Sequence, residues 1–371
     1  MNPSIISGWD IPKKAYLHAH QNNQLIKVVM ELSNICNKSC AGCFTKKIKD
    51  SWTTKSKKRL PNEQPLEIQL AMIDEAYAIG ARTVDIVGAG EPTLDPNFQT
   101  VVEYITNKKM HAIIFTLGEH SALAEYAKKW SNKPVSFFIK FWSKNPQLQN
   151  SYVADNTGLY TMRRDAMIEK LILLGYTKGA TQQIDGTNHH STRLGADILV
   201  MKSNYAEIPE LFRFCRENNI MPEIKSYIPA GPTHLSQMQA ASIYTAAMLN
   251  ALKKDEVTPK DMYDLRKNII NIDSKEFNIP ELPTCYIQGP KCTQSVASLY
   301  ITITGEIRSC VGTSHVYGTY IPEKNMLAQT LQQRIEQTSF GCIPRLIEAE
   351  LKKEQLPQEL RTIYEDGKTN T

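Results

Sequence analysis

The sequence predicts an α/β fold: a TIM-like partial (βα)6 barrel followed by a small C-terminal unit made of a β-hairpin and a helix. Strand-like and helix-like segments alternate from residue 26 to about residue 230, which is typical of a parallel sheet. The alternation stops near residue 255, and a hairpin-like pattern begins at residue 298. With 371 residues, 42% of them hydrophobic, the chain is long enough for two packed units.

The predicted strands of the barrel are six short segments rich in β-branched and aromatic residues. They are residues 26–33, 83–87, 112–116, 135–141, 196–201 and 223–228. Parallel strands of this kind carry functional side chains at their carboxyl ends. An open, doubly wound sheet shows the same alternation and is the alternative, but we favour the partial barrel.

A helical segment follows each predicted strand. The first, residues 66–79, has apolar residues at Leu66, Leu70 and Ile73 and stops before Gly80, a residue typical of helix C-caps. The next four are residues 98–107, 122–130, 161–174 and 208–218, and the apolar stretch 237–252 supplies the sixth.

The C-terminal part has a different pattern. Residues 255–277 are charged and are predicted to form a helical or irregular linker. Alternation over 298–304, followed by Gly305 and Ile307, predicts a β-hairpin. The expected units are an N-terminal extension (1–25), the barrel (26–235), a helical linker (236–280), a small cysteine-bearing domain (281–345) and a helical tail (346–371).

Three cysteines, Cys36, Cys40 and Cys43, lie within eight residues directly after the first predicted strand. Thiolates at this spacing can bind three irons of a four-iron cube and leave the fourth iron open. Zinc is the main alternative, but a structural zinc site takes four ligands, and no fourth Cys or His is nearby in the sequence. Incidental free thiols are the third interpretation. We favour an iron–sulfur cluster.

This C-x3-C-x2-C pattern, with the aromatic Phe44 directly after it, resembles that of the radical S-adenosylmethionine (radical SAM) enzymes. The resemblance covers roughly residues 26–230. It implies that the three cysteines hold a [4Fe-4S] cluster, that the amino and carboxyl groups of SAM bind the open iron, and that Phe44 lies beside SAM.

A second motif supports the resemblance. The stretch after the second strand is similar to the Gly-Gly-Glu-Pro stretch with which the family binds the SAM amino group, and it consists of Gly88, Ala89, Gly90, Glu91 and Pro92. Small residues allow close backbone approach, and a carboxylate suits a cationic ammonium group. Ala89 replaces a glycine of the family pattern. The same resemblance implies SAM contacts from Thr116, Ser143 and Asn204, which follow strands three, four and five.

Four further cysteines lie near the C-terminus: Cys285, Cys292, Cys310 and Cys342. The spacing from Cys292 through Gly305 to Cys310 resembles the opening of the SPASM/twitch extensions of radical SAM enzymes, although the full SPASM pattern does not follow. The resemblance implies one auxiliary [4Fe-4S] cluster held by these four cysteines. A four-cysteine zinc site is the alternative.

The remaining cysteine, Cys215, lies on the apolar face of helix 208–218. This position predicts a buried core thiol. A role as hydrogen donor, which a cysteine has in some radical epimerases, is the alternative.

The resemblance implies an enzyme that reductively cleaves SAM to a 5′-deoxyadenosyl radical, which abstracts hydrogen from a substrate. The auxiliary cluster would accept an electron or anchor the substrate. Only 35 residues precede Cys36, too few for the peptide-recognition domain of many relatives, so we favour a small metabolite such as a sugar, nucleoside or amino-acid derivative. The alternatives are maturation of a ribosomally made peptide by crosslinking, epimerisation or oxidation, and, in another class, a non-enzymatic iron–sulfur or zinc scaffold.

The whole net charge of +5 comes from one segment, residues 46–59, which carries +6 while the rest of the chain carries −1. Its basic residues are Lys46, Lys47, Lys49, Lys55, Lys57, Lys58 and Arg59. The rest of the chain is close to neutral, which argues against a nucleic-acid binder. We expect a solvated insertion, a docking site for an acidic electron donor such as flavodoxin or ferredoxin, or a patch that steers an anionic substrate. With no long apolar run and no signal-peptide core, we expect a cytoplasmic protein without membrane contact.

Overall fold

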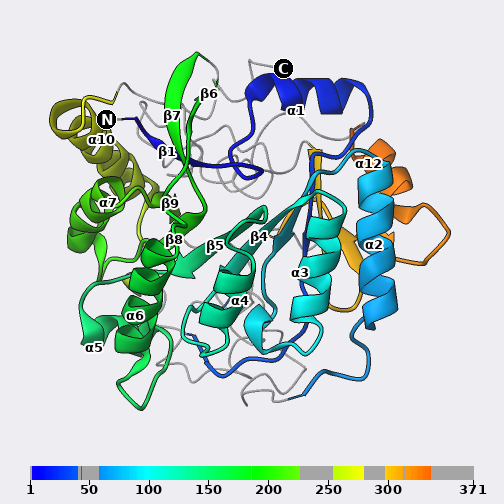
Figure 1. The fold of residues 1–371 in the computed structure, drawn as a ribbon, viewed down its shortest axis with the longest axis horizontal. Helices are drawn as coiled ribbons and strands as arrows, with labels where there is room; N and C mark the ends of the chain where they lie inside the picture. Colours follow the sequence, from blue (N-terminus) through cyan, green and yellow to red (C-terminus); the bar gives the residue numbers. More distant parts are fainter. Residues whose placement is uncertain are drawn as a thin grey trace.

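The structure is a computed structural model, and it describes residues 2–40, 43, 58–184, 186–225, 254–279, 297–311 and 315–335. Its centre is a mixed nine-stranded sheet in the order β12-β11-β10-β2-β3-β4-β5-β8-β9 (Figure 1). A separate three-stranded sheet has the order β1-β7-β6.

Six strands of the large sheet form the predicted partial barrel. They are β2 (Lys27–Met30), β3 (Thr83–Ile86), β4 (His111–Thr116), β5 (Val135–Lys140), β8 (Leu194–Leu199) and β9 (Met221–Lys225). All five neighbouring pairs are parallel and follow chain order. A doubly wound sheet would reverse this order part-way. The predicted partial barrel is therefore confirmed, and the sheet is not closed.

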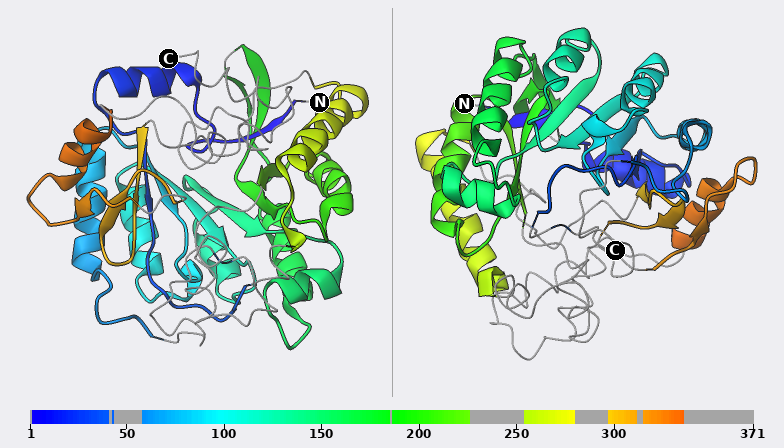
Figure 2. Two further views of the ribbon diagram at one scale, coloured as in Figure 1. Left: turned by 180° about the vertical axis from the view of Figure 1, so that it is seen from behind. Right: turned by 90° about the horizontal axis from the view of Figure 1, so that it is seen from below.

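Helices cover the outer face of these strands. They are α2 (Leu66–Ala78), α3 (Phe98–Asn107), α4 (Leu123–Lys129), α5 (Pro146–Tyr152), α6 (Tyr160–Leu173) and α7 (Ile208–Glu217). Figure 2 shows several of them from below as an arc outside the strands. The main hydrophobic core lies between this arc and the sheet and includes Phe98, Trp130 and Tyr176. The helix expected over 237–252 lies outside the described residues.

The N-terminal extension closes the amino end of the barrel. Strand β1 (Ser4–Ile6) pairs in parallel with β7 (Thr187–Thr192), which forms a hairpin with β6 (Thr181–Ile184), and α1 (Lys13–Gln21) lies at the same end (Figure 1). The ring of Trp9 packs on Phe115 and Phe138, with centroids 5.3 and 5.0 Å away. None of these four elements was predicted from the sequence.

The predicted C-terminal hairpin is present. It consists of β10 (Ser298–Ile301) and β11 (Glu306–Arg308), with Gly305 at a positive φ of 82°, and β12 (Gly318–Thr319) and α12 (Met326–Ile335) follow. Strand β10 pairs in parallel with β2, so the hairpin extends the barrel sheet. The backbone N–H of Ile303 donates to the buried Glu31 carboxylate at 2.9 Å, just after β2.

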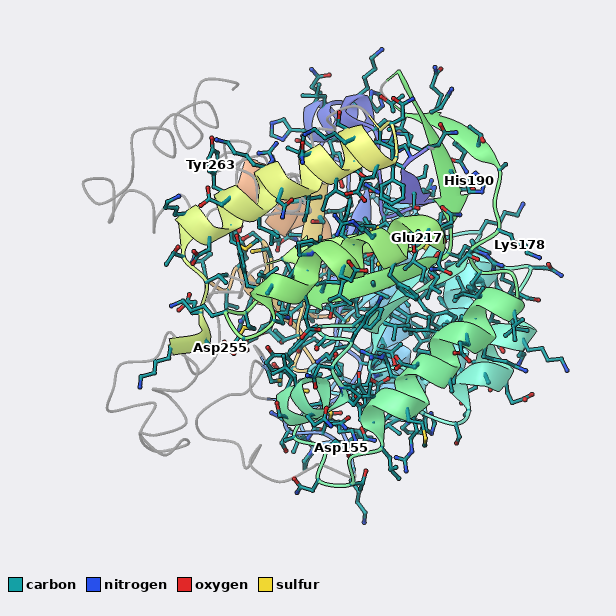
Figure 3. The ribbon with its side chains drawn as sticks, turned by 90° about the vertical axis from the view of Figure 1, so that its left-hand side faces the viewer. Asp155, Lys178, His190, Glu217, Asp255 and Tyr263 are labelled. Atoms are coloured by element: carbon teal, nitrogen blue, oxygen red, sulfur yellow. The ribbon has the colours of Figure 1, made fainter. Side chains whose placement is uncertain are left out.

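The linker forms a helix, α10 (Pro259–Glu276), which begins with a capping box between Thr258 and Asp261. Residues 259–276 of the predicted linker range are therefore helical, and its role as a linker between two domains stays a prediction. Arg216 of α7 donates two hydrogen bonds of 2.8 Å to Asp273, and Figure 3 shows α10 lying along α7. In the part of the chain that the structure describes, no helix has the length and hydrophobicity needed to cross a membrane.

Candidate active site at the carboxyl ends of the strands

The cysteine loop follows β2 and is fixed by its own polar side chains. Lys38, between the first two cysteines, reaches Asp155 at 2.8 Å and Glu119 at 3.0 Å, and all three side chains are buried. The side-chain amide of Asn37 donates to the same Glu119 at 2.7 Å. Glu119 follows β4 and Asp155 follows α5, so the loop is anchored to two further connections at the carboxyl end of the barrel (Figure 3 labels Asp155).

The thiols of Cys36, Cys40 and Cys43 pack around the buried Leu117 and Tyr160 and form no disulfide. The pKa of Cys36 is raised to about 12, chiefly by burial and also by the charges of Cys40, Glu91 and Cys43, while the backbone N–H of Lys38, 3.4 Å from Sγ, lowers it in part. A buried group of thiols becomes ionised when a cation binds it, because the metal displaces the protons.

Lys140, the last residue of β5, adds a positive charge to this site. Its Nζ donates to Cys40 Sγ at 3.4 Å and lies 4.4 Å from the ring centroid of Trp142. Burial lowers the pKa of Lys140, but the charges of Cys40, Asp197 and Cys43 outweigh burial and raise it. The ammonium group therefore favours thiolates at the cysteine loop.

The glycine-rich turn after β3 packs directly against the cysteine loop. The backbone N–H of Glu91 donates to Ile35 O at 2.7 Å. A Cβ on Gly90 would lie 2.1 Å from the same carbonyl, and one on Gly88 would lie 1.8 Å from Gly90 O. Glycine is therefore required at both positions for the turn and the loop to meet. Ala89, between them, is buried.

The carboxylate of Glu91 is buried and has a fixed orientation. Its Oε1 accepts hydrogen bonds from the hydroxyls of Thr93 (2.6 Å) and Thr116 (2.5 Å) and from the backbone N–H of Thr93 (3.2 Å). Its Oε2 accepts one, from Leu117 N at 2.7 Å. The structure thus brings together two of the residues predicted to bind SAM, Glu91 and Thr116. The contributions of Thr93 and Leu117 were missed.

The comparisons with known proteins concern this fold. No family model matches the chain. It is similar to a curated protein of Pyrococcus furiosus, the tungsten-containing aldehyde ferredoxin oxidoreductase cofactor-modifying protein, with 21% identity over 85% of this chain and 77% of the relative. Among solved structures it matches Streptococcus suis SuiB bound to the precursor peptide SuiA, with a TM-score of 0.59, 15% identity and coverage of 86% of this chain and 68% of SuiB. SuiB bound to S-adenosylmethionine gives a TM-score of 0.56 at 15% identity, over 86% of this chain and 67% of that one. SuiB is a radical SAM enzyme.

The chain has the radical SAM fold.

Two residues predicted to contact SAM have other partners in this radical SAM fold. Ser143 is fully buried, and its hydroxyl donates to Glu207 at 2.7 Å. Asn204 is also fully buried: its amide donates to Trp142 O (2.6 Å) and Leu199 O (2.8 Å), and its oxygen accepts from Met201 N. Ser143 ties the end of β5 to the connection before α7, and Asn204 links the ends of β5 and β8, so their SAM contacts stay predictions.

The other predicted residues lie apart from this group or outside the described residues. Pro92 opens a short 3-10 helix (Pro92–Leu94) directly after Glu91. Cys310 follows β11 and is partly buried, whereas Phe44, Cys285, Cys292 and Cys342 lie outside the described residues. Cys215 is fully buried in the main core, and burial raises its pKa to about 12. This core position agrees with the prediction of a buried thiol on the apolar face of the helix. The alternative role of Cys215 as a hydrogen donor stays a prediction.

A row of charged residues inside the radical SAM barrel was not predicted. Lys140, Asp197 and Glu223 are in register on β5, β8 and β9, and Lys225 follows on β9. Lys225 Nζ lies 2.6 Å from Asp197 and 3.3 Å from Glu223. Partial burial and the charge of Asp197 raise the pKa of Glu223 to about 7, and Lys225 compensates only in part. Charged residues at alternate positions of otherwise apolar strands were the signal that sequence reasoning overlooked.

Glu223 predicts a pH dependence of stability. A folded-state pKa of about 7, above the ordinary glutamate value of 4.5, means that the native state keeps a proton that the unfolded chain releases. The free energy of unfolding should therefore fall as pH rises from about 4.5 to above 7, by about 3 kcal/mol in all. In E223Q this decrease in the free energy of unfolding with rising pH should be absent. Urea unfolding of both proteins at about pH 5 and about pH 8 measures the difference, and equal slopes with pH would contradict the prediction.

Lys38 is predicted to position the cysteine loop. K38M leaves the carboxylate of Asp155 buried without its cation and leaves Glu119 with only Arg163, at 3.6 Å, which typically costs about 3 kcal/mol. We expect a lower stability and less than half of the wild-type iron after reconstitution. K38R should restore part of both, and K14M, at an exposed position on α1, is the control. Full iron binding by K38M at unchanged stability would show that the loop does not need this anchor.

Proposed function

We propose that this chain is an enzyme that binds a [4Fe-4S] cluster through Cys36, Cys40 and Cys43 and uses it to cleave SAM. The observation that carries the proposal is the contact between the cysteine loop and the Gly88–Glu91 turn at the carboxyl ends of a radical SAM barrel. When bound, the cluster supplies the electron that breaks the C5′–S bond of SAM and so yields the 5′-deoxyadenosyl radical that abstracts hydrogen from a substrate.

The donor set fits this cluster. A four-iron cube takes one thiolate on each of three irons, and the chain supplies three thiols from one anchored loop, with Lys140 to balance their charge. Among the described residues, no three Cys, His, Asp or Glu side chains are placed to hold one single metal ion. Three thiols suit a four-iron cube with one open iron better than a structural zinc site, which takes four ligands.

Glu91 would bind the amino group of SAM. A carboxylate oxygen has two lone pairs, and Oε2 of Glu91 uses one for the Leu117 N–H. The second is available for an ammonium donor, while the three hydrogen bonds on Oε1 prevent rotation of the carboxylate. Because the carboxylate is buried, a charge-assisted hydrogen bond here is stronger than one in water.

The auxiliary [4Fe-4S] cluster is the second part of the proposal. Cys310 follows strand β11, and β11 and β10 join the hairpin to β2, which leads into the cysteine loop. Cys285, Cys292 and Cys342 would complete the set. A cluster there would accept an electron from the substrate or anchor it.

For the substrate we propose a small metabolite, and a peptide is the second candidate. The P. furiosus relative is described as cofactor-modifying, which favours a small molecule. SuiB was solved with a precursor peptide bound, which favours a peptide. The charged barrel interior described above accepts polar groups from either class.

An acidic electron donor such as flavodoxin or ferredoxin is also proposed, at residues 46–59. Of the seven basic residues, the structure describes Lys58 and Arg59. Arg59 is bound within the protein, to Asp95 at 2.6 Å and to Gln64 O at 2.5 Å. The docking charges would therefore be the lysines that precede it.

Anaerobic reconstitution with iron and sulfide, followed by SAM and dithionite, tests the function. We expect about eight irons per chain for two cubes and formation of 5′-deoxyadenosine, measured by chromatography. About four irons would remove the auxiliary cluster from the proposal. A non-enzymatic scaffold would bind iron or zinc and release no 5′-deoxyadenosine.

A further inference from the structure

The charged row inside the barrel is partly accessible to solvent. Most residues of the barrel strands are buried, but the side chains of Asp197, Glu223 and Lys225 remain 13%, 14% and 23% exposed although they point into the barrel. Phe115 and Val29, at inward positions of β4 and β2, are also partly accessible. The amino end below them is filled by Trp9, Ile6 and their aromatic neighbours. The accessible inward side chains therefore lie on the cysteine-loop side of this filled end.

The charges around this space do not balance. Lys27 and Asp85 form a fully buried pair at 2.9 Å, and Lys140 faces the thiol of Cys40. The remaining group contains two carboxylates, Asp197 and Glu223, and one ammonium, Lys225. One negative charge is left when both carboxylates are ionised and Lys140, whose pKa Asp197 also raises, is counted with the thiolates of the cysteine loop.

The carboxylate oxygens of this group that remain available are also suited to a cation, because they are hydrogen-bond acceptors. Lys225 contacts Asp197 through Oδ1 and Glu223 through Oε2. Within the described ranges, no hydrogen bond or ion pair engages Asp197 Oδ2 or Glu223 Oε1. Asp197 and Glu223 are register partners on adjacent parallel strands, so acceptors from both are available to one donor between them.

We propose that Asp197 and Glu223 bind a protonated primary amine of the substrate. This inference rests on the proposed function. The charged row begins at Lys140, which contacts Cys40 of the cysteine loop. An amine bound at the other end of the row, by Asp197 and Glu223, would direct its carbon chain toward the proposed SAM site. An ammonium group supplies the missing positive charge and up to three N–H donors. A substrate carboxylate would add a further negative charge, and a hydroxyl would leave the imbalance in place.

The amine can belong to a free metabolite or to a lysine side chain of a peptide. Two matched probe pairs separate these sources: n-butylamine with n-butanol, and Nα-acetyl-lysine amide with Nα-acetyl-norleucine amide. Binding of each to the reconstituted enzyme with SAM is measured by calorimetry in two buffers of different ionisation enthalpy. We expect the amines to bind at least tenfold more tightly than their neutral partners.

Proton release gives a second readout. A cation between the carboxylates favours ionised Glu223, so at neutral pH amine binding should release a fraction of a proton. The charged groups that face Glu223 are Asp197, Lys225 and, farther away, Lys27. E223Q should bind butylamine at least tenfold more weakly and release no proton, and D197N should weaken binding by a similar factor. E276Q, in the exposed pair with Arg213, is the matched control.

Equal binding of amines and alcohols, or amine binding that E223Q and D197N leave unchanged, would overturn the inference. Preference for the alcohols would instead indicate a hydroxyl-bearing substrate and would also overturn it. Formation of 5′-deoxyadenosine by the wild-type enzyme is assayed separately without any probe. Its absence would overturn the proposed function, whereas its presence together with indifference to amines would overturn only the inference.

Discussion

Replacing Gly90 with alanine is expected to destabilise the protein by about 3 kcal/mol and to remove most of its cluster binding. The new Cβ would lie 2.1 Å from the carbonyl oxygen of Ile35 and 2.7 Å from the carbonyl carbon of Asn34. Both are backbone atoms at the start of the cysteine loop, so the loop itself must move. Urea unfolding and iron per chain after reconstitution measure the two effects.

G318A is the matched control for this substitution. At Gly318 in β12 the nearest atom to a new Cβ is the terminal methyl of Met326 at 3.4 Å, an ordinary contact with a flexible side chain. We expect little change in stability or iron content. If G90A also retained full iron binding, the close contact between turn and loop would have no role in forming the site.

E91Q is expected to keep its iron but to lose about 100-fold in SAM affinity and in the rate of 5′-deoxyadenosine formation. The substitution removes a buried negative charge whose hydrogen bond to a cation contributes about 2–3 kcal/mol. It also places an NH2 group among donors, because Thr93, Thr116 and Leu117 all donate to this carboxylate in the native protein. Equilibrium binding of SAM and product chromatography measure the two losses.

Circular dichroism and iron content separate this effect from a folding defect. E67Q, at an exposed position in the first turn of α2, should behave as wild type. Unchanged SAM affinity in E91Q would mean that the carboxylate only ties β3 to β4, and the predicted ammonium contact would then be wrong.

Helix positions were the most predictable part of this fold. The apolar spacing over residues 98–107 gave the bounds of α3 (Phe98–Asn107) as the structure has them, because that face packs on the sheet core. The cysteine loop and the Gly88–Glu91 turn were also found from the sequence, because their spacing and residue types resemble radical SAM motifs. Their mutual contact was not foreseen, as it depends on the approach of two backbones.

Side-chain direction at the strand ends was harder to predict. Ser143 was chosen near the end of the fourth predicted strand, whereas Lys140, three residues earlier, contacts Cys40. Which alternate residues of a strand face the barrel depends on register with its neighbours. The β6–β7 hairpin was missed for a related reason: β6 is exposed and polar, and the pair is held by β1 from the distant N-terminus.

The position of β10 beside β2 has a consequence for biosynthesis. Strand β2 is complete by residue 30, but its partner on one side is made only after the ribosome has added more than 260 further residues. Until then one edge of the nascent sheet exposes unpaired backbone groups next to the reactive thiols, which invites aggregation. Chaperone binding during this interval would protect the chain, and recombinant yield should depend on it.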